Sequence, residues 1–250
     1  NSALSLGTHD IWGYDPGVLL RYARFIGFTQ GYNPEKISNY IDFKENHRLL
    51  KMLRLRFILI PQGSQIKILQ NRDFLPRLNL IENWEVIPEK AAVLKRMGAQ
   101  SFDPARTVIL EKPPGIGSAV QAPAGTGKAA WSEPGTGNCR IIDESTDHLT
   151  VKAHLIREAI LLITDNYSRG WRITPLPETG QQSYEILPGN YTLMAVPLKK
   201  GEHQLRLEYA PVGYRVGIWI TVFALVFYIL LLIRFLLAQR NASLPTKNDI

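Results

Sequence analysis

What the sequence lacks restricts the classes of function open to it. Cys139 is the only cysteine, so no disulfide can form within the chain, and the histidines show no paired spacing typical of metal ligands. The net charge of +7 comes from lysines and arginines that are interleaved with acidic residues, and no basic run is present. We therefore predict no metal site, no cofactor and no nucleic-acid partner.

Motifs for nucleotide binding and nucleophilic catalysis are also missing. The stretch 125–128 resembles part of a phosphate-binding loop, but Ala122 stands where that motif has glycine and Ala129 where it has serine or threonine. No serine or cysteine lies in a nucleophile elbow. Asp143, Glu144 and Asp147 fit an acid pair, a cation site or a solvated turn, and the sequence gives them no catalytic partner.

The most prominent feature that is present is an uncharged apolar run, Val216–Ile233, bracketed by Arg215 and Arg234. Its leucine, isoleucine, valine and phenylalanine residues favour the bilayer by roughly 4 to 8 kcal/mol on an insertion scale, and its length suits a membrane-crossing helix. A buried core helix is the alternative, although such helices are usually shorter. We predict a transmembrane helix over 213–238, followed by a tail over 239–250.

The first part of the chain, 1–111, predicts a mixed α+β region. A helix opens at Asp15-Pro16 and ends at Gly27, and a second short helix covers Glu45–Leu53. Phe57–Ile60 predicts a buried strand, with Gln65–Leu69 as its hairpin partner. A strand region at 76–86, a helix at 88–97 and a strand at 107–110 complete this region.

A proline- and glycine-rich stretch, 112–138, predicts a long loop between the first region and a second one. The second region, 139–212, predicts an antiparallel β-sandwich of jelly-roll-like type because short strands alternate with turn residues at close spacing. Its expected strands are 140–143, 148–154, 159–164, 171–174, 184–187, 191–196 and 203–209. Only the connection 210–213 separates the last strand from the apolar run, and it reaches about 13 Å. The fold class is therefore α+β with one C-terminal transmembrane helix.

Several segments, taken in order, carry a resemblance to a known family. They are Gly13-Tyr14-Asp15-Pro16 with Arg21-Tyr22, Leu49–Ile60, Leu75-Pro76-Arg77, Phe102-Asp103-Pro104 with Val108–Glu111, Asp165–Trp171, and Gly201-Glu202-His203 with Tyr209-Ala210-Pro211 and Gly217. This order before a terminal apolar run resembles the C-terminal part of YfhO-like bacterial membrane proteins, which are similar to the GT-C glycosyltransferases. Two positions depart from the family pattern. The turn 166–171 lacks the family's proline, and Phe57 replaces a tyrosine.

The resemblance implies an envelope glycosyltransferase-like protein in the bacterial plasma (inner) membrane that uses polyprenyl-phosphate sugars. Its catalytic carboxylates would lie upstream of Asn1, so this chain would hold no catalytic residue and would be a C-terminal fragment or processed product. The soluble part would be extracytoplasmic and the tail cytoplasmic. The expected partners are the lipid bilayer, the upstream transmembrane region of the same protein, and a polyprenyl-phosphate sugar or envelope glycopolymer. A non-catalytic membrane-anchored binding or assembly module of the cell envelope remains the alternative.

One turn is the candidate ligand-binding patch. Tyr167 and Trp171 present aromatic faces that suit sugar rings, and Arg169 and Arg172 present planar donors that suit phosphate or hydroxyl groups. Strand alternation equally allows Trp171 to fill the core of the sandwich. The turn Lys199-Lys200-Gly201 fits contact with anionic headgroups or a plain hairpin turn.

Overall fold

A computed structural model describes residues 10–12, 17–37, 41–116, 135–177 and 179–242. The chain divides into two compact units, Asn1–Glu208 and Tyr209–Ile250. The predicted helix start at Asp15, the stretch 125–128 and most of the predicted tail lie outside the described residues.

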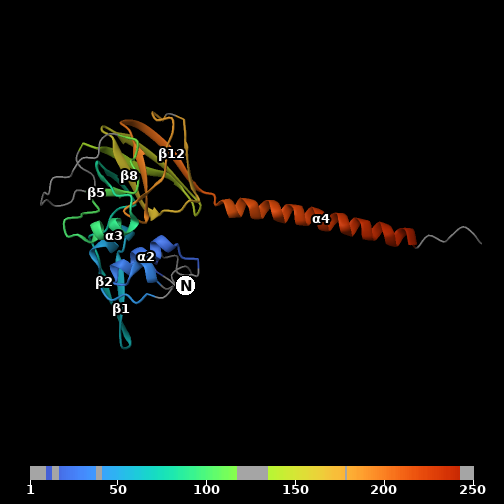
Figure 1. Ribbon diagram of the computed structural model, residues 1–250, viewed down its shortest axis with the longest axis horizontal. Coiled ribbons are helices and arrows are strands. Elements are labelled where there is room, and N and C mark those ends of the chain that lie inside the picture. The colour runs from blue at the N-terminus through green and yellow to red at the C-terminus, as the bar shows by residue number, and fades with distance from the viewer. Residues whose placement is uncertain (1–9, 13–16, 38–40, 117–134, 178, 243–250) are drawn as a thin grey trace, which may run out of the picture. The chain divides into compact units, whose positions relative to one another are not determined.

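The centre of the first unit is a six-stranded sheet with the order β3-β8-β11-β10-β5-β4 (Figure 1). Neighbouring strands are antiparallel, apart from the parallel pair β4 and β5. The bounds are β3 Leu78–Ile81, β4 Asn83–Val86, β5 Thr107–Leu110, β8 Ala159–Asn166, β10 Leu187–Gly189 and β11 Leu193–Leu198. This sheet crosses the predicted boundary at 112–138, because β3 and β5 supply hydrogen-bond partners for β8 and β10. Sequence periodicity marks strands but does not show which of them pair.

A four-stranded sheet with the order β6-β7-β12-β9 forms the second layer of the sandwich. Its strands are β6 Gly137–Glu144, β7 His148–Leu155, β9 Trp171–Pro175 and β12 Gly201–Tyr209. The two sheets enclose a cluster of buried aliphatic side chains, here called the second core. The predicted α+β class with an antiparallel sandwich is confirmed. The turn at Lys199-Lys200, however, joins β11 of one sheet to β12 of the other and closes no hairpin.

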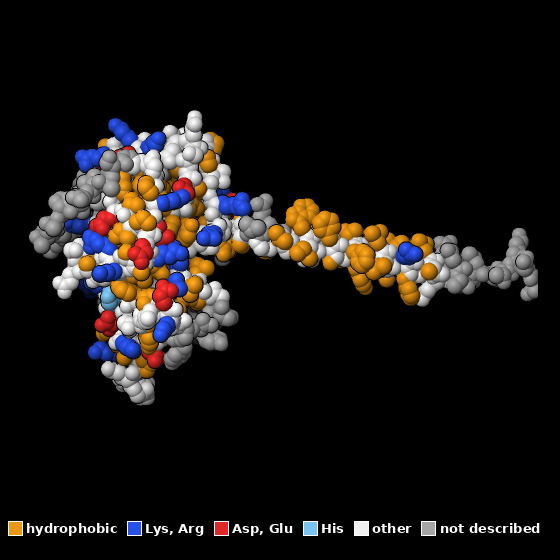
Figure 2. All heavy atoms as spheres, viewed as in Figure 1, with side chains coloured by type: hydrophobic (Ala, Val, Ile, Leu, Met, Phe, Trp, Pro, Cys, Tyr) orange, Lys and Arg blue, Asp and Glu red, His pale blue; other side chains and the backbone are white. Residues whose placement is uncertain are grey.

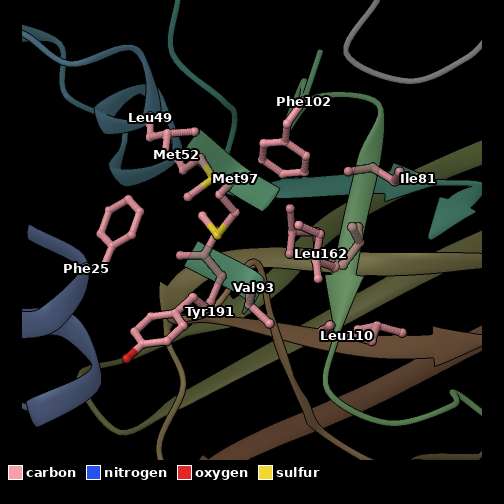
Figure 3. Packing of buried hydrophobic residues seen from close by; sticks show 14 of the residues in the cluster. Phe25, Leu49, Met52, Ile81, Val93, Met97, Phe102, Leu110, Leu162 and Tyr191 are labelled. Atoms are coloured by element: carbon pink, nitrogen blue, oxygen red, sulfur yellow. The ribbon is translucent and has the colours of Figure 1, made fainter. Parts of the chain in front are cut away.

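Helices cover the opposite face of the six-stranded sheet. They are α2 Leu20–Thr29 and α3 Lys90–Gly98, with short 3-10 helices η1 Pro34–Lys36 and η2 Arg48–Leu53. Their apolar side chains pack on the sheet and form the first core, part of which is drawn in Figure 3. The central strand β8 is buried on both sides: Ile160 and Leu162 belong to the first core, whereas Leu161 and Ile163 belong to the second. That double burial explains why its sequence is continuously apolar.

The helix α2 differs from its prediction at both ends. The predicted helix opens at Asp15-Pro16, but residues 17–19 are not helical and α2 begins at Leu20, after an extended Leu19. The sequence predicts that Gly27 ends the helix, but the helix continues to Thr29. A Cβ atom at Gly27 would lie 1.9 Å from Cδ1 of Ile37, so the glycine permits close packing of the following chain against the helix. Glycine thus serves packing at this position, whereas helix termination is its commoner role.

Strands β1 Phe57–Gln62 and β2 Gln65–Gln70 form an antiparallel hairpin, as predicted, but the prediction that Phe57–Ile60 is buried is wrong. The two strands make a sheet of their own, and Leu59 is 62% exposed. In Figure 1 the hairpin projects away from the two larger sheets of its unit. A short apolar run predicts a strand, but the sequence does not show whether another layer covers that strand.

In its described residues, the second unit contains one helix, α4 Val212–Ala242. Within it Val216–Gln239 is long and apolar enough to cross a membrane, and none of its most apolar stretch is buried in the structure. Hydrophobic side chains cover most of its visible length in Figure 2. The structure therefore confirms the predicted apolar C-terminal helix.

Candidate functional site

The predicted ligand-binding turn connects β8 of the six-stranded sheet to β9 of the four-stranded sheet. Backbone hydrogen bonds fix its course: the Tyr167 amide donates to the Thr192 carbonyl at 2.7 Å, and the Trp171 amide donates to the Ser168 carbonyl at 3.2 Å. The hydroxyl of Ser168 also accepts from the Gly170 amide at 3.2 Å. The turn is thus held by hydrogen bonds within it and to Thr192, without the family's proline.

The structure separates the four predicted residues into two pairs. Tyr167 and Trp171 are half-buried and pack against the second core. Arg169 and Arg172 are exposed, and no hydrogen bond or ion pair of either guanidinium is recorded within the described part of the chain. Trp171 therefore packs at the edge of the second core, whereas the side chains of the two arginines face solvent.

An arginine from α2 reaches the same turn. The Arg21 guanidinium lies 5.8 Å from the ring centre of Tyr167 and 4.9 Å from that of Tyr191. Its Nε donates to the Tyr191 carbonyl at 2.7 Å, and its two terminal nitrogens bind both carboxylate oxygens of Glu111. The Arg21 and Glu111 side chains are only 20% and 16% exposed. Such a bidentate pair fixes the orientation of the guanidinium between two aromatic rings.

The backbone beside this pair adopts an uncommon conformation. Asn190 and Tyr191 have φ angles of 44° and 69°, in the left-handed region that non-glycine residues rarely occupy. Two hydrogen bonds between Asn190 and β5 offset the strain. The backbone amide of Asn190 donates to the Ile109 carbonyl at 2.9 Å, and its side-chain oxygen accepts from the backbone amide of Ile109 at 2.8 Å. Strained residues held in this way are enriched at functional sites.

Tyr191 is a buried member of this arrangement. Figure 3 shows its ring at the edge of the first core, on the side of Phe25, with the hydroxyl pointing away from the labelled apolar side chains. Burial raises the pKa of Tyr191, and the positive charges of Arg24 and Arg21 oppose that change. The phenol therefore stays protonated at neutral pH and acts as a hydrogen-bonding group.

A second ion-pair network lies where β8 ends. Both Nε and a terminal nitrogen of Arg77 donate to the Asp165 carboxylate, at 2.9 and 2.8 Å, and Arg54 donates to its other oxygen at 2.8 Å. Arg77 also pairs with Glu144 on the neighbouring sheet. Although burial by itself lowers the pKa of Arg77, its hydrogen bonds and charge interactions with the two carboxylates raise it overall. Asp165 of β8 thus binds the residue that follows η2 and the residue that precedes β3.

The fold brings together segments that lie far apart in the chain. Arg21, Arg54, Arg77 and Glu111 come from different segments of the first region, yet they meet around Asp165–Tyr167 at the end of β8. All belong to segments on which the family resemblance rests. These pairings could not be predicted from the sequence, because residue spacing along the chain carries no signal for contacts between separate elements.

Two histidines in the described residues also have polar partners. His203 accepts at Nδ1 from the Tyr184 hydroxyl and donates from Nε2 to the Lys199 carbonyl, both at 2.7 Å. In the acidic turn, His148 lies 3.0 Å from Asp143 and 3.1 Å from Asp147, which fits the solvated-turn alternative. The searched part of the chain contains no group of three or more potential metal ligands.

A comparison with protein families identifies one part of the chain. Residues 140–221 match the family model of the bacterial membrane protein YfhO. The YfhO match covers the candidate turn, most of the second sheet and the first residues of the apolar part of α4. No curated protein and no solved structure matches the chain. The resemblance to YfhO is confirmed over these residues, and the match together with the apolar helix associates the chain with a membrane.

Proposed function

We propose that this chain is the C-terminal accessory domain and membrane anchor of an envelope glycosyltransferase-like protein that uses polyprenyl-phosphate sugars. In this proposal the sheet-containing unit is extracytoplasmic, α4 crosses the bacterial plasma membrane, and the catalytic carboxylates belong to an upstream transmembrane region. The YfhO match supports the proposal, because it joins the candidate turn to the membrane helix within one continuous segment.

The role proposed for the accessory domain is to hold the sugar phosphate or the glycopolymer acceptor. The observation that carries this role is that Arg169 and Arg172 are exposed in a turn that also contains the half-buried Tyr167. Arginine donors match phosphate and hydroxyl geometry, and an aromatic face matches a sugar ring. By contrast, the neighbouring arginines are already paired with carboxylates and help to position the turn. They are Arg21, paired with Glu111, and Arg54 and Arg77, paired with Asp165.

The test is a sugar-transfer assay on the full-length protein in membranes, supplied with a polyprenyl-phosphate sugar and the acceptor. Arg169→Ala and Arg172→Ala should each raise the KM by roughly tenfold or more, because each removes a charge-assisted hydrogen bond worth about 1.5 to 3 kcal/mol. Arg140→Ala is the matched control, since Arg140 is an exposed arginine of β6 outside the turn.

Two results would contradict the proposal. If all three variants transfer sugar with an unchanged KM, the turn does not handle substrate. If no polyprenyl-phosphate sugar supports transfer by the wild-type protein, the non-catalytic binding or assembly module becomes the better explanation.

A further inference from the structure

The hairpin β1–β2 presents exposed apolar side chains that neither of the two larger sheets covers. It pairs with neither of the two larger sheets, and its strands carry Phe57, Leu59, Ile66 and Ile68 at 51, 62, 65 and 61% exposure. A two-stranded hairpin is marginally stable in water by itself, and contiguous exposed apolar side chains mark an interaction surface.

The register divides the hairpin into two unlike faces. Cross-strand partners share a face, so the pairs Phe57–Gln70, Leu59–Ile68 and Pro61–Ile66 place five apolar side chains on one side, here called the apolar face. The other side, the mixed face, is formed by the pairs Ile58–Leu69, Ile60–Lys67 and Gln62–Gln65. All four of the most exposed apolar side chains lie on the apolar face.

The charges of this segment have one sign. Arg54, Arg56, Lys67 and Arg72 lie between residues 54 and 72, which contain no aspartate or glutamate. Arg54 is paired with Asp165, but Lys67 and Arg72 are exposed, and no ion pair of either is recorded among the described residues. Basic groups beside an apolar face complement a bilayer surface that carries anionic lipid.

We propose that the β1–β2 hairpin lies flat in the interfacial layer of the membrane, with its apolar face toward the acyl chains and its mixed face toward headgroups and water. Deep insertion is disfavoured because both strand edges carry unpaired backbone groups and the tip, 62–65, is polar. Stacking of two copies through their apolar faces is the competing arrangement. The basic side chains favour the bilayer instead, because Lys67 lies on the mixed face and Arg72 lies beyond the strands, where both can reach anionic headgroups.

This inference rests on the membrane association of the chain and not on sugar transfer, so a failed transfer assay leaves it standing. The experiment places the chain in vesicles of equal parts phosphatidylglycerol and phosphatidylcholine, in a Cys139→Ala background. A single cysteine replaces Leu59 on the apolar face or Ile60 on the mixed face, and it carries a polarity-sensitive fluorophore. Both positions are exposed, so neither substitution disturbs a core.

An acyl-chain nitroxide should quench the label at residue 59 at least about twofold more strongly than the label at residue 60, because neighbouring strand residues point to opposite faces. Vesicles of phosphatidylcholine alone, or the double variant Lys67→Glu and Arg72→Glu, should weaken that quenching. Equal quenching at both positions, or none at either, would overturn the proposal. The proposal would also be overturned if the fluorescence of the label is blue-shifted but not quenched by the nitroxide, and if that shift depends on the protein-to-lipid ratio. This result would indicate that a second copy of the chain covers the apolar face.

Discussion

The ion-pair network around Asp165 offers the sharpest test of how the first unit is held together. The Asp165 side chain is 15% exposed and accepts hydrogen bonds from Arg54 and Arg77, the latter 29% exposed. Removing one partner of a fully buried pair costs 3 to 5 kcal/mol, and the remaining solvent contact reduces our expectation for Asp165→Ala to about 2 to 3 kcal/mol. For a unit of this size such a loss lowers the melting temperature by about 4 to 12 °C.

The measurement is thermal and urea unfolding of the whole chain in detergent micelles, followed by tryptophan fluorescence. Trp84 is 2% exposed in the first core and reports on the unit that contains Asp165. Glu144→Ala is the matched control, since Glu144 binds the same Arg77 but is 54% exposed and should contribute about 0 to 1 kcal/mol.

A second substitution separates the stability lost with the ion pair from the destabilisation caused by an unpaired charge. Arg77→Met added to Asp165→Ala should recover part of the lost stability, because it removes a guanidinium that has lost its main partner. If Asp165→Ala is no more destabilising than Glu144→Ala, the network does not stabilise the junction of the elements and our reasoning is refuted.

Two further predictions concern titratable groups. Burial lowers the pKa of His203, so as the pH falls this histidine binds a proton in the unfolded chain before it does so in the native chain. The contribution of neutral His203 to the free energy of unfolding should therefore be complete above about pH 6.5. Below that pH it should decline by up to about 1.4 kcal/mol per pH unit. Urea titrations at several pH values should show a shallower decline in His203→Asn, and identical slopes would contradict this assignment. Burial also raises the pKa of the Cys139 thiol to about 11, so alkylation at pH 8 should be on the order of a hundredfold slower in the native chain than in urea, and equal rates would show that the thiol is not shielded.

The hydrophobic pattern predicted the positions of most helices and strands correctly, but it did not predict which strands pair. The strand prediction at 107–110 coincides with β5, whereas the prediction at 184–187 overlaps β10 only at Leu187. The segment before Leu187 has apolar residues, Tyr184 and Ile186, that pack on the second core without strand pairing. Apolar periodicity reports that a side chain is buried, and strand pairing depends in addition on a neighbouring backbone.

The sequence by itself determined the features that depend on local chemistry. An uncharged apolar run long enough to span a bilayer has few alternatives to a helix, so α4 could be predicted without knowledge of the rest of the chain. Likewise, alternating strand and turn residues specified the sandwich, and the aromatic and basic composition of 166–172 singled out the candidate turn.

Only the tertiary structure decided the features that depend on contacts between distant residues. It joined Arg21 to Glu111 and Arg77 to Asp165, and it brought β3 and β5 into one sheet with β8 and β10. It also left the β1–β2 hairpin uncovered, although its sequence reads as a buried strand pair. Side-chain pairing and burial are set by which elements meet in space, and the order of residues along one element does not contain that information.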